Sequence, residues 1–292
     1  MKRVITIITI IFVLYSIAFF VSRNMESTSL VNKIAIIPIY GEISIGDHEP
    51  LYEQQTAASN AIIAYLELAE KDSSIKGIIL EINSPGGAVV ASSEVAQKVK
   101  EIKKPVVSLI REVGASGAYW IASASDAIVA NPLSITGSIG VISTYLEFSE
   151  LLEKYGIKAS TITAGEFKDT GSPFRSLTDE EKVILQNKIN MIHNEFVSSV
   201  SENRKIDVSK YATGMFYLGK EAKDIGLIDY LGDKNLAINI TKQLANIKEA
   251  EIVQYKQPAN LLSVLKQFTS EFGINIGKGI SSNLVQESKI SV

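Results

Sequence analysis

Residues Gly77-Ile-Ile-Leu-Glu-Ile-Asn-Ser-Pro-Gly-Gly87 join an apolar, β-branched run to a Pro-Gly-Gly turn. The run is typical of a buried strand, and the turn ends it. A second run, Pro105-Val-Val-Ser-Leu-Ile110, is followed closely by Gly114-Ala-Ser-Gly-Ala118, and a helical pattern from about Ala91 to Ile102 lies between the two runs. Strands that alternate with helices predict parallel βαβ units, so the sequence indicates an α/β fold.

Further elements flank this region on both sides. Thr178-Asp-Glu-Glu181 has the pattern of a capping box and predicts a long helix to about Glu202. After Gln257 the pattern loosens into an amphipathic segment, Leu261–Phe272, and a polar tail. The remaining predictions are a strand over Lys33–Ile39, a helix over Ala57–Glu70, a turn at Val113-Gly114, a helix over Ser116–Ala124, strands over Ala127–Ala130 and Gly140–Ile142, and a helix from Ala222 that Gly226 ends before a strand.

The composition of the chain excludes several classes of function. Its 292 residues, 46% of them hydrophobic, can supply a substantial core. A formal net charge of −3 offers no basic field to a phosphate backbone, so we expect no binding of nucleic acid. The chain has no cysteine, which excludes disulfides, thiolate metal ligands and a cysteine nucleophile. We predict neither a metal site nor a cofactor.

The N-terminus carries an uncharged apolar run, Val4–Val21, between Lys2-Arg3 and Arg23. Its length approaches the roughly 20 residues that a helix needs to span a bilayer. A cleaved signal peptide is the alternative, but its apolar region is shorter and ends in a small-residue site that this stretch lacks. We therefore predict one N-terminal transmembrane helix, and the excess of positive charge before it places the N-terminus in the cytoplasm.

Two loops after predicted strands have the residues for chemistry. In Asn83-Ser-Pro-Gly-Gly87, paired glycines can leave backbone N–H groups free to contact an anion or a developing oxyanion. In Gly114-Ala-Ser116-Gly-Ala118, a serine stands where a helix begins. Each loop alone fits a structural role as well, since the first can be an ordinary strand-to-helix turn and Ser116 can be an N-cap.

A serine nucleophile needs a base, and the chain contains only two histidines. His48 lies in a polar loop, and His193 falls inside the predicted long helix, so neither is a persuasive base. A lysine can serve when burial lowers its pKa from about 10.4 towards 7–8. The best candidate is Lys168, in the small-residue loop Ala164-Gly-Glu-Phe-Lys168-Asp-Thr-Gly-Ser-Pro173, although a solvated loop lysine is the ordinary interpretation of such a residue.

Taken together, these residues resemble the signal peptide peptidase A family of membrane serine proteases, in its short single-domain form. The resemblance spans about residues 33–231 and rests on five ordered motifs: Asn83-Ser-Pro-Gly-Gly87, Gly114-Ala-Ser116-Gly-Ala-Tyr119, Thr136-Gly-Ser138-Ile-Gly-Val141, Gly165-Glu-Phe-Lys168-Asp-Thr-Gly-Ser-Pro173 and Gly226-Leu-Ile-Asp229. It implies the Clp protease/crotonase-like fold, a repeated ββα superhelix.

The resemblance also assigns roles to individual residues. It implies a dyad with Ser116 as nucleophile and Lys168 as general base, and it implies that Ser138 orients the lysine amine. The backbone N–H groups of Gly87 and Gly117 would form the oxyanion hole. The family completes this dyad between neighbouring protomers of a ring- or dome-shaped homo-oligomer, so a monomer is expected to be inactive.

The family degrades remnant signal peptides and other membrane-associated peptides, which implies an enzyme of the cell membrane with its catalytic domain outside the cytoplasm. The expected layout is residues 1–3 in the cytoplasm, 4–21 as a single-pass signal anchor, 22–32 as a linker, 33–256 as the protease domain and 257–292 as a C-terminal tail that the enzyme can process itself. A disordered tail is the alternative.

Two other functions use the same fold. A crotonase-like acyl-CoA enzyme also forms an oxyanion hole from two backbone N–H groups, but it needs neither the anchor nor Ser116, Ser138 and Lys168. A catalytically inactive membrane scaffold is the third possibility, and an intact Ser-Lys pair argues against it.

Overall fold

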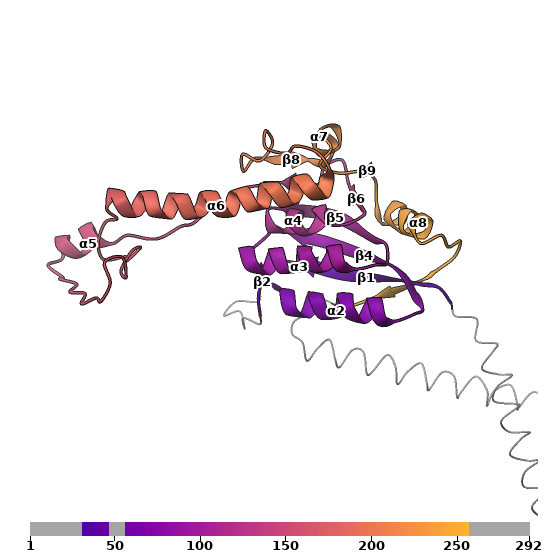
Figure 1. Ribbon diagram of the computed structural model, residues 1–292, viewed down its shortest axis with the longest axis horizontal. Helices are drawn as coiled ribbons and strands as arrows, with labels where there is room; N and C mark the ends of the chain where they lie inside the picture. Colours follow the sequence, from indigo (N-terminus) through magenta and orange to yellow (C-terminus); the bar gives the residue numbers. More distant parts are fainter. Residues whose placement is uncertain (1–30, 47–55, 257–292) are drawn as a thin grey trace, which may run out of the picture.

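The computed structural model describes residues 31–46 and 56–256 (Figure 1). Its centre is an eight-stranded sheet in which six strands follow the order β10-β1-β4-β5-β6-β9, and each neighbouring pair in that path is parallel. These strands are β1 (Lys33–Tyr40), β4 (Ile75–Ser84), β5 (Val106–Ala115), β6 (Ala127–Ala130), β9 (Tyr230–Leu231) and β10 (Glu251–Gln254). The parallel sheet that the alternation of strands and helices predicts is thus confirmed.

Four further strands, of three residues each, complete the β-structure within the described residues. The end of β5 also pairs in parallel with β7 (Ile135–Gly137), and β7 pairs in antiparallel fashion with β8 (Phe216–Leu218). A separate two-stranded sheet joins β2 (Glu42–Ser44) to β3 (Thr56–Ala58). Because β5 continues past its partner β6, its carboxyl end reaches β7, and the turn after β5 begins where β7 ends.

Alternating side chains of the central strands enter two different cores, which explains why apolar residues occupy consecutive positions in these strands. On β1, Ala35 and Ile37 belong to the larger core, whereas Ile34 and Ile36 belong to the smaller one. Helices α2 (Ser59–Lys71), α3 (Val89–Glu101) and α4 (Gly117–Ser123) cover the larger core, and α8 (Lys234–Leu244) covers the smaller one on the other face (Figure 1). The sheet is therefore shielded from water on both faces.

A long helix, α6 (Asp179–Arg204), begins with the predicted capping box. The Thr178 side chain accepts the Glu181 N–H, and the Glu181 carboxylate accepts the Thr178 N–H. Towards its other end, α6 packs on α4 through Trp120 and Phe196, whose rings stack with centroids 4.5 Å apart. One half of α6 is thus fixed to the core, while its beginning extends away from the sheet (Figure 1).

The chain between β7 and α6 forms an extension that we call the arm, residues 140–178. It carries the short helix α5 (Ser149–Lys154) and runs out along the projecting part of α6 (Figure 1). No residue from 140 to 176 is buried, although the preceding Ile139 is fully buried and Leu177 is buried again. The arm therefore has no hydrophobic core of its own within this chain.

Helices α2, α3, α4 and α6 and strands β1, β4, β5 and β6 were predicted within a few residues, but α8 was not predicted and two predictions were wrong. The strand predicted over Gly140–Ile142 lies earlier, at Ile135–Gly137, because this segment pairs with the end of β5. The turn predicted at Val113-Gly114 lies inside β5, which runs on to Ala115. The helix ended by Gly226 is α7 (Gly219–Asp224), and Gly226 has a positive φ of 81° as expected of a helix stop.

Several predictions fall outside the described residues: the anchor over Val4–Val21, the amphipathic segment Leu261–Phe272, and the loop that holds His48. Within the two described ranges, no helix has both the length and the apolar character needed to cross a bilayer.

Candidate active site

Ser116 occupies a strained turn between β5 and α4. Its φ of 53° and ψ of −125° are uncommon for a residue with a side chain, and such conformations cost about 1–3 kcal/mol. A hydrogen bond to β7 holds the turn in place, since the Ser116 N–H donates to the Gly137 carbonyl oxygen at 2.8 Å. The hydroxyl makes no capping hydrogen bond to α4, so the N-cap interpretation does not describe this side chain. Some hydrolases expose a nucleophilic serine on a strand-to-helix turn of this kind.

The predicted glycine loop lies directly against this turn. A Cβ at Gly86, whose φ is 105°, would stand 2.7 Å from the Gly117 nitrogen and 2.9 Å from the Ser116 Cβ. A Cβ at Gly117 would stand 3.4 Å from the Gly87 nitrogen. The backbones of the two loops therefore approach each other closely beside Ser116, and only glycine permits this approach at Gly86.

The N–H groups of Gly87 and Gly117 are available at this meeting point. Neither donates to a backbone acceptor within residues 31–46 and 56–256. Gly117 opens α4, where no earlier turn of helix can accept its N–H. Two neighbouring free N–H groups beside a serine can stabilise an oxyanion that forms when the serine attacks a carbonyl.

A cavity of about 630 Å³ opens over these groups. Ser116, Gly87, Gly117 and Ser138 all line it, so the structure brings together four of the five predicted site residues. Much of the remaining wall is apolar, with contributions from Val89, Trp120, Val141, Ile142, Ile189 and Phe196. The site can therefore accept a chain with apolar side chains next to the serine.

Ser138 reaches the cavity because it directly follows β7. Its φ is 50°, its N–H donates to the Met215 carbonyl oxygen at 2.9 Å, and its hydroxyl donates to the Gly214 carbonyl oxygen at 3.2 Å. Since Ala115 pairs with Gly137 across β5 and β7, Ser116 and Ser138 follow adjacent strand ends. The pairing of these two short segments is what places both hydroxyls at one cavity.

Lys168 does not share this site within one chain. It belongs to the arm, its residue is exposed, and it is not among the residues that line the cavity of Ser116. Its backbone N–H donates to the Gly165 carbonyl oxygen at 3.3 Å. The fifth predicted residue is therefore separate from the other four in a single copy of the protein.

His193 also lines the cavity, although its position in the sequence did not indicate this. It lies on one face of α6 together with Gln186, Ile189 and Asn190, at helical spacings of three and four residues, and all four line the cavity. This spacing was the available signal, but only the packing of Phe196 on Trp120 shows which face of α6 turns towards Ser116.

The late motif Gly226-Leu-Ile-Asp229 makes hydrogen bonds to the elements that surround the site. Asp229 accepts two hydrogen bonds from the Arg204 guanidinium, at 2.7 and 3.0 Å, and one from the Ile128 N–H at 2.8 Å. The buried Tyr119 hydroxyl donates to the Leu227 carbonyl oxygen at 2.7 Å. The motif thus connects α4, which begins at the serine turn, to β6 and α6.

The close approach at Gly86 yields a test of this geometry. We expect Gly86→Ala to lower the free energy of unfolding by about 1–3 kcal/mol and to abolish cleavage, because the new methyl group displaces the Ser116 turn. Urea unfolding and a peptide-cleavage assay measure the two effects. Gly156→Ala is the matched control, since Gly156 also has a positive φ, of 66°, but has no atom within 4 Å of the added Cβ. Normal cleavage by Gly86→Ala would contradict the placement.

Two protein families match parts of this chain. Residues 98–248 match peptidase family S49, and residues 47–132 match the Clp protease family. A protein of Methanocaldococcus jannaschii that is named as a protease is 39% identical over 306 residues, covering 100% of this chain and 98% of the relative. A protein of Enterococcus faecium with the name signal peptide peptidase SppA is 32% identical over 240 residues, covering 80% of this chain and 70% of the relative.

A solved structure supports the fold. A serine-to-alanine mutant of the 1510-N membrane-bound stomatin-specific protease superposes with a TM-score of 0.51 at 15% identity, covering 78% of this chain and 99% of that chain. At this identity the likeness concerns architecture alone, and it agrees with a mixed α/β fold with a Clp protease-like domain. The family match and the two sequence relatives lead to one assignment: this chain is a serine-type peptidase that belongs to peptidase family S49, the family of signal peptide peptidase A.

Proposed function

We propose that the enzyme cleaves peptides with Ser116 as nucleophile and with Lys168 of a neighbouring copy as general base. The observation that carries this proposal is the incomplete site of the single chain. Ser116 stands on a strained turn beside the N–H groups of Gly87 and Gly117, which have no backbone acceptor in the described part of the chain, while Lys168 lies on an arm without buried residues up to Ser176. A second copy would supply both the missing base and a cover for the arm.

The chemistry follows from these positions. The neutral Lys168 amine takes the proton of the Ser116 hydroxyl, and the oxygen attacks the scissile carbonyl carbon. The N–H groups of Gly87 and Gly117 donate to the resulting oxyanion. The lysine then gives its proton to the leaving amine, and water hydrolyses the acyl-enzyme with the lysine as base again. Ser138, on the cavity wall, would donate or accept a hydrogen bond that orients the amine.

Exposed apolar side chains on the arm support self-association. Ile142 is 90% exposed and Ile162 is 97% exposed, and further exposed apolar residues of the arm are Tyr145, Leu146, Phe148, Leu151, Tyr155, Ile157, Phe167 and Phe174. Apolar surface on this scale marks an interaction site. A ring or dome of identical copies would cover it and would remove Lys168 from water, as a lysine base requires.

We further propose a substrate class and a location. The apolar cavity wall suits extended apolar segments, and the Enterococcus faecium relative has the name of a signal peptide peptidase. Remnant signal peptides and other membrane-associated peptides would therefore be the substrates. The uncharged run Val4–Val21 would hold the enzyme in the cell membrane, with the catalytic domain outside the cytoplasm.

His193 is a second candidate base because it lines the cavity of Ser116 within the same chain. Histidine is the commonest general base in hydrolases with a serine nucleophile. This alternative needs no second copy, and it makes the opposite prediction for substitutions of Lys168.

A serine-reactive fluorophosphonate tests the nucleophile. In the assembled oligomer we expect a covalent adduct on Ser116, found by mass spectrometry of the digested protein, because the Ser116 oxygen displaces fluoride from phosphorus. Ser116→Ala should show no adduct, whereas Ser138→Ala should keep the Ser116 adduct. A correctly assembled wild-type oligomer that forms no adduct would refute the proposed nucleophile.

A further inference from the structure

Within one chain, polar contacts fix the backbone around Lys168, because the arm has no buried residues of its own. From residue 140 to residue 176 no side chain is buried in this chain. A base that takes a proton from a serine must nevertheless be held closely in place, and a displacement of about 1 Å can cost about 100-fold in rate. The Lys168 loop therefore needs contacts that connect it to a rigid element.

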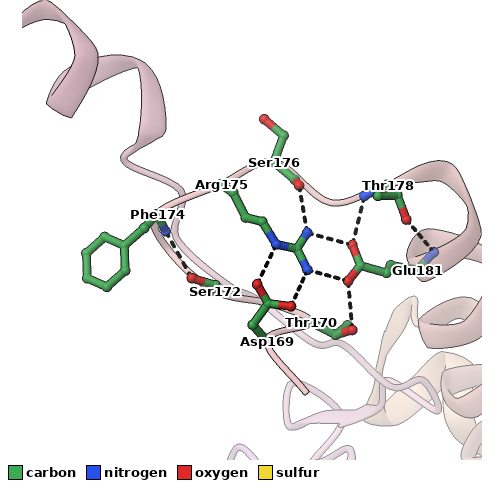
Figure 2. A network of polar contacts seen from close by, with 8 residues as sticks. All are labelled: Asp169, Thr170, Ser172, Phe174, Arg175, Ser176, Thr178 and Glu181. Atoms are coloured by element: carbon green, nitrogen blue, oxygen red, sulfur yellow. Dashed lines mark hydrogen bonds and ion pairs between the residues drawn. The ribbon is translucent and has the colours of Figure 1, made fainter. Parts of the chain in front are cut away.

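A network centred on Arg175 makes this connection (Figure 2). The guanidinium donates to both carboxylate oxygens of Asp169, at 2.7 and 2.8 Å, and Asp169 is the residue directly after Lys168. The same guanidinium donates to both carboxylate oxygens of Glu181, at 2.6 and 2.8 Å. Such paired contacts fix direction as well as distance, which a single ion pair does not do.

Glu181 connects the network to a rigid helix. Its side chain is only 3% exposed, it belongs to the first turn of α6, and it also accepts hydrogen bonds from the Thr178 N–H and the Thr170 hydroxyl. The far half of α6 is fixed to the core through Phe196 and the fully buried Val200. Asp169 and Thr170, the two residues that follow Lys168, are therefore both connected to α6. The core in turn holds α6 in place.

We propose that Arg175 is a positioning residue that holds Lys168 in place by connecting Asp169 to Glu181. The inference rests on the proposed function, in which Lys168 is the general base. Arg175 touches no substrate in this account, and it acts through the backbone of Asp169. Lysine could not replace it fully, because an ammonium group is a point charge and cannot pair with two carboxylates in a fixed plane.

The network stays charged at neutral and alkaline pH. Hydrogen bonds from Arg175 hold the pKa values of Asp169 and Glu181 below their usual range and raise the pKa of Arg175 itself. Because the carboxyl pKa values are lowered in the folded protein, their contribution is complete above the ordinary value of about 4 and is lost as the pH falls further. The Lys168 loop is therefore held throughout the neutral and alkaline range.

The test compares Arg175→Ala, Arg175→Lys and Lys182→Ala in the full-length oligomer with a fluorogenic apolar peptide. For Arg175→Ala we expect a kcat about 100-fold lower, an unchanged KM and a wild-type oligomer size by light scattering. Arg175→Lys should show most of the same drop in kcat. Lys182→Ala is the matched control, because it removes an exposed ion pair with Asp179 in the same helical turn without touching the Lys168 loop, and we expect it to behave as wild type.

Added methylguanidinium separates positioning from a merely structural role. It should restore part of kcat in Arg175→Ala by occupying the space between the two carboxylates, and it should not help Lys168→Ala. A wild-type kcat in Arg175→Ala would overturn the inference. So would a lowered kcat that methylguanidinium does not restore, or a failure of both Arg175 variants to assemble. If Lys168→Ala is fully active, the proposed dyad and this inference both fail. If Lys168→Ala is inactive while Arg175→Ala is fully active, the dyad stands and this inference alone fails.

Discussion

Lys168→Ala should lower kcat/KM for peptide cleavage by at least about 1,000-fold while the oligomer stays folded and assembled. The reason is that Lys168 is the proposed base, and His193 on the cavity wall would then only contact the substrate. Lys168→His should be equally inactive, because a shorter imidazole on the same backbone cannot reach the position of a lysine amine. Steady-state kinetics with a fluorogenic peptide, together with light scattering, measure both properties.

His193→Gln is the decisive control for this prediction. Glutamine keeps a polar side chain of similar size on the cavity wall but cannot act as a base at neutral pH. We expect His193→Gln to retain catalysis within a few-fold of wild type, since His193 would only line the substrate site. The reverse pattern, an active Lys168→Ala and an inactive His193→Gln, would assign the base to His193 and make a single chain sufficient.

The sequence predicted the sheet because local and tertiary preferences agree there. The runs in β4 and β5 have apolar residues at consecutive positions, such as Ile78-Ile-Leu80 in β4, and in the structure both faces of these strands are covered. The capping box of α6 is a local device, and it formed as predicted. In contrast, β10 was not predicted, because this short strand is defined by its pairing with β1 at the sheet edge, more than 200 positions away in the chain.

The candidate site was predictable only in part, for a related reason. The Ser116 motif could be an N-cap or a nucleophile, and the conformation that distinguishes them depends on a hydrogen bond to Gly137, which is distant in sequence. The misplaced strand at Gly140–Ile142 has the same origin, since apolar residues in this stretch face a cavity and an exposed arm instead of a core. His193 was missed because the orientation of α6 is set by tertiary packing.

The separation of Lys168 from Ser116 is the least predictable feature and the most informative one. Spacing along the chain does not show whether two residues meet in one copy or between two copies. The structure shows an arm without buried residues that carries the lysine, and a cavity that holds the other four candidate residues. This division of the site between two structural units is the basis of the proposal that neighbouring copies share it.

Mixed oligomers of two inactive variants test this proposal most directly. Ser116→Ala and Lys168→Ala chains, co-expressed with different affinity tags and purified through both tags in turn, form oligomers that contain both variants. A Lys168→Ala chain still provides Ser116, and a Ser116→Ala neighbour provides Lys168. If each site takes its serine from one copy and its lysine from the next, random mixing restores about a quarter of the sites. Each variant alone should remain inactive.

The measurement is the cleavage rate per chain of the doubly purified oligomer, compared with the wild type and with each variant alone. Our account predicts about a quarter of the wild-type rate, together with a fluorophosphonate adduct on the Lys168→Ala chains only. Mixed oligomers of normal size that are as inactive as the separate variants would contradict the account, because they would show that Ser116 and Lys168 do not combine across copies.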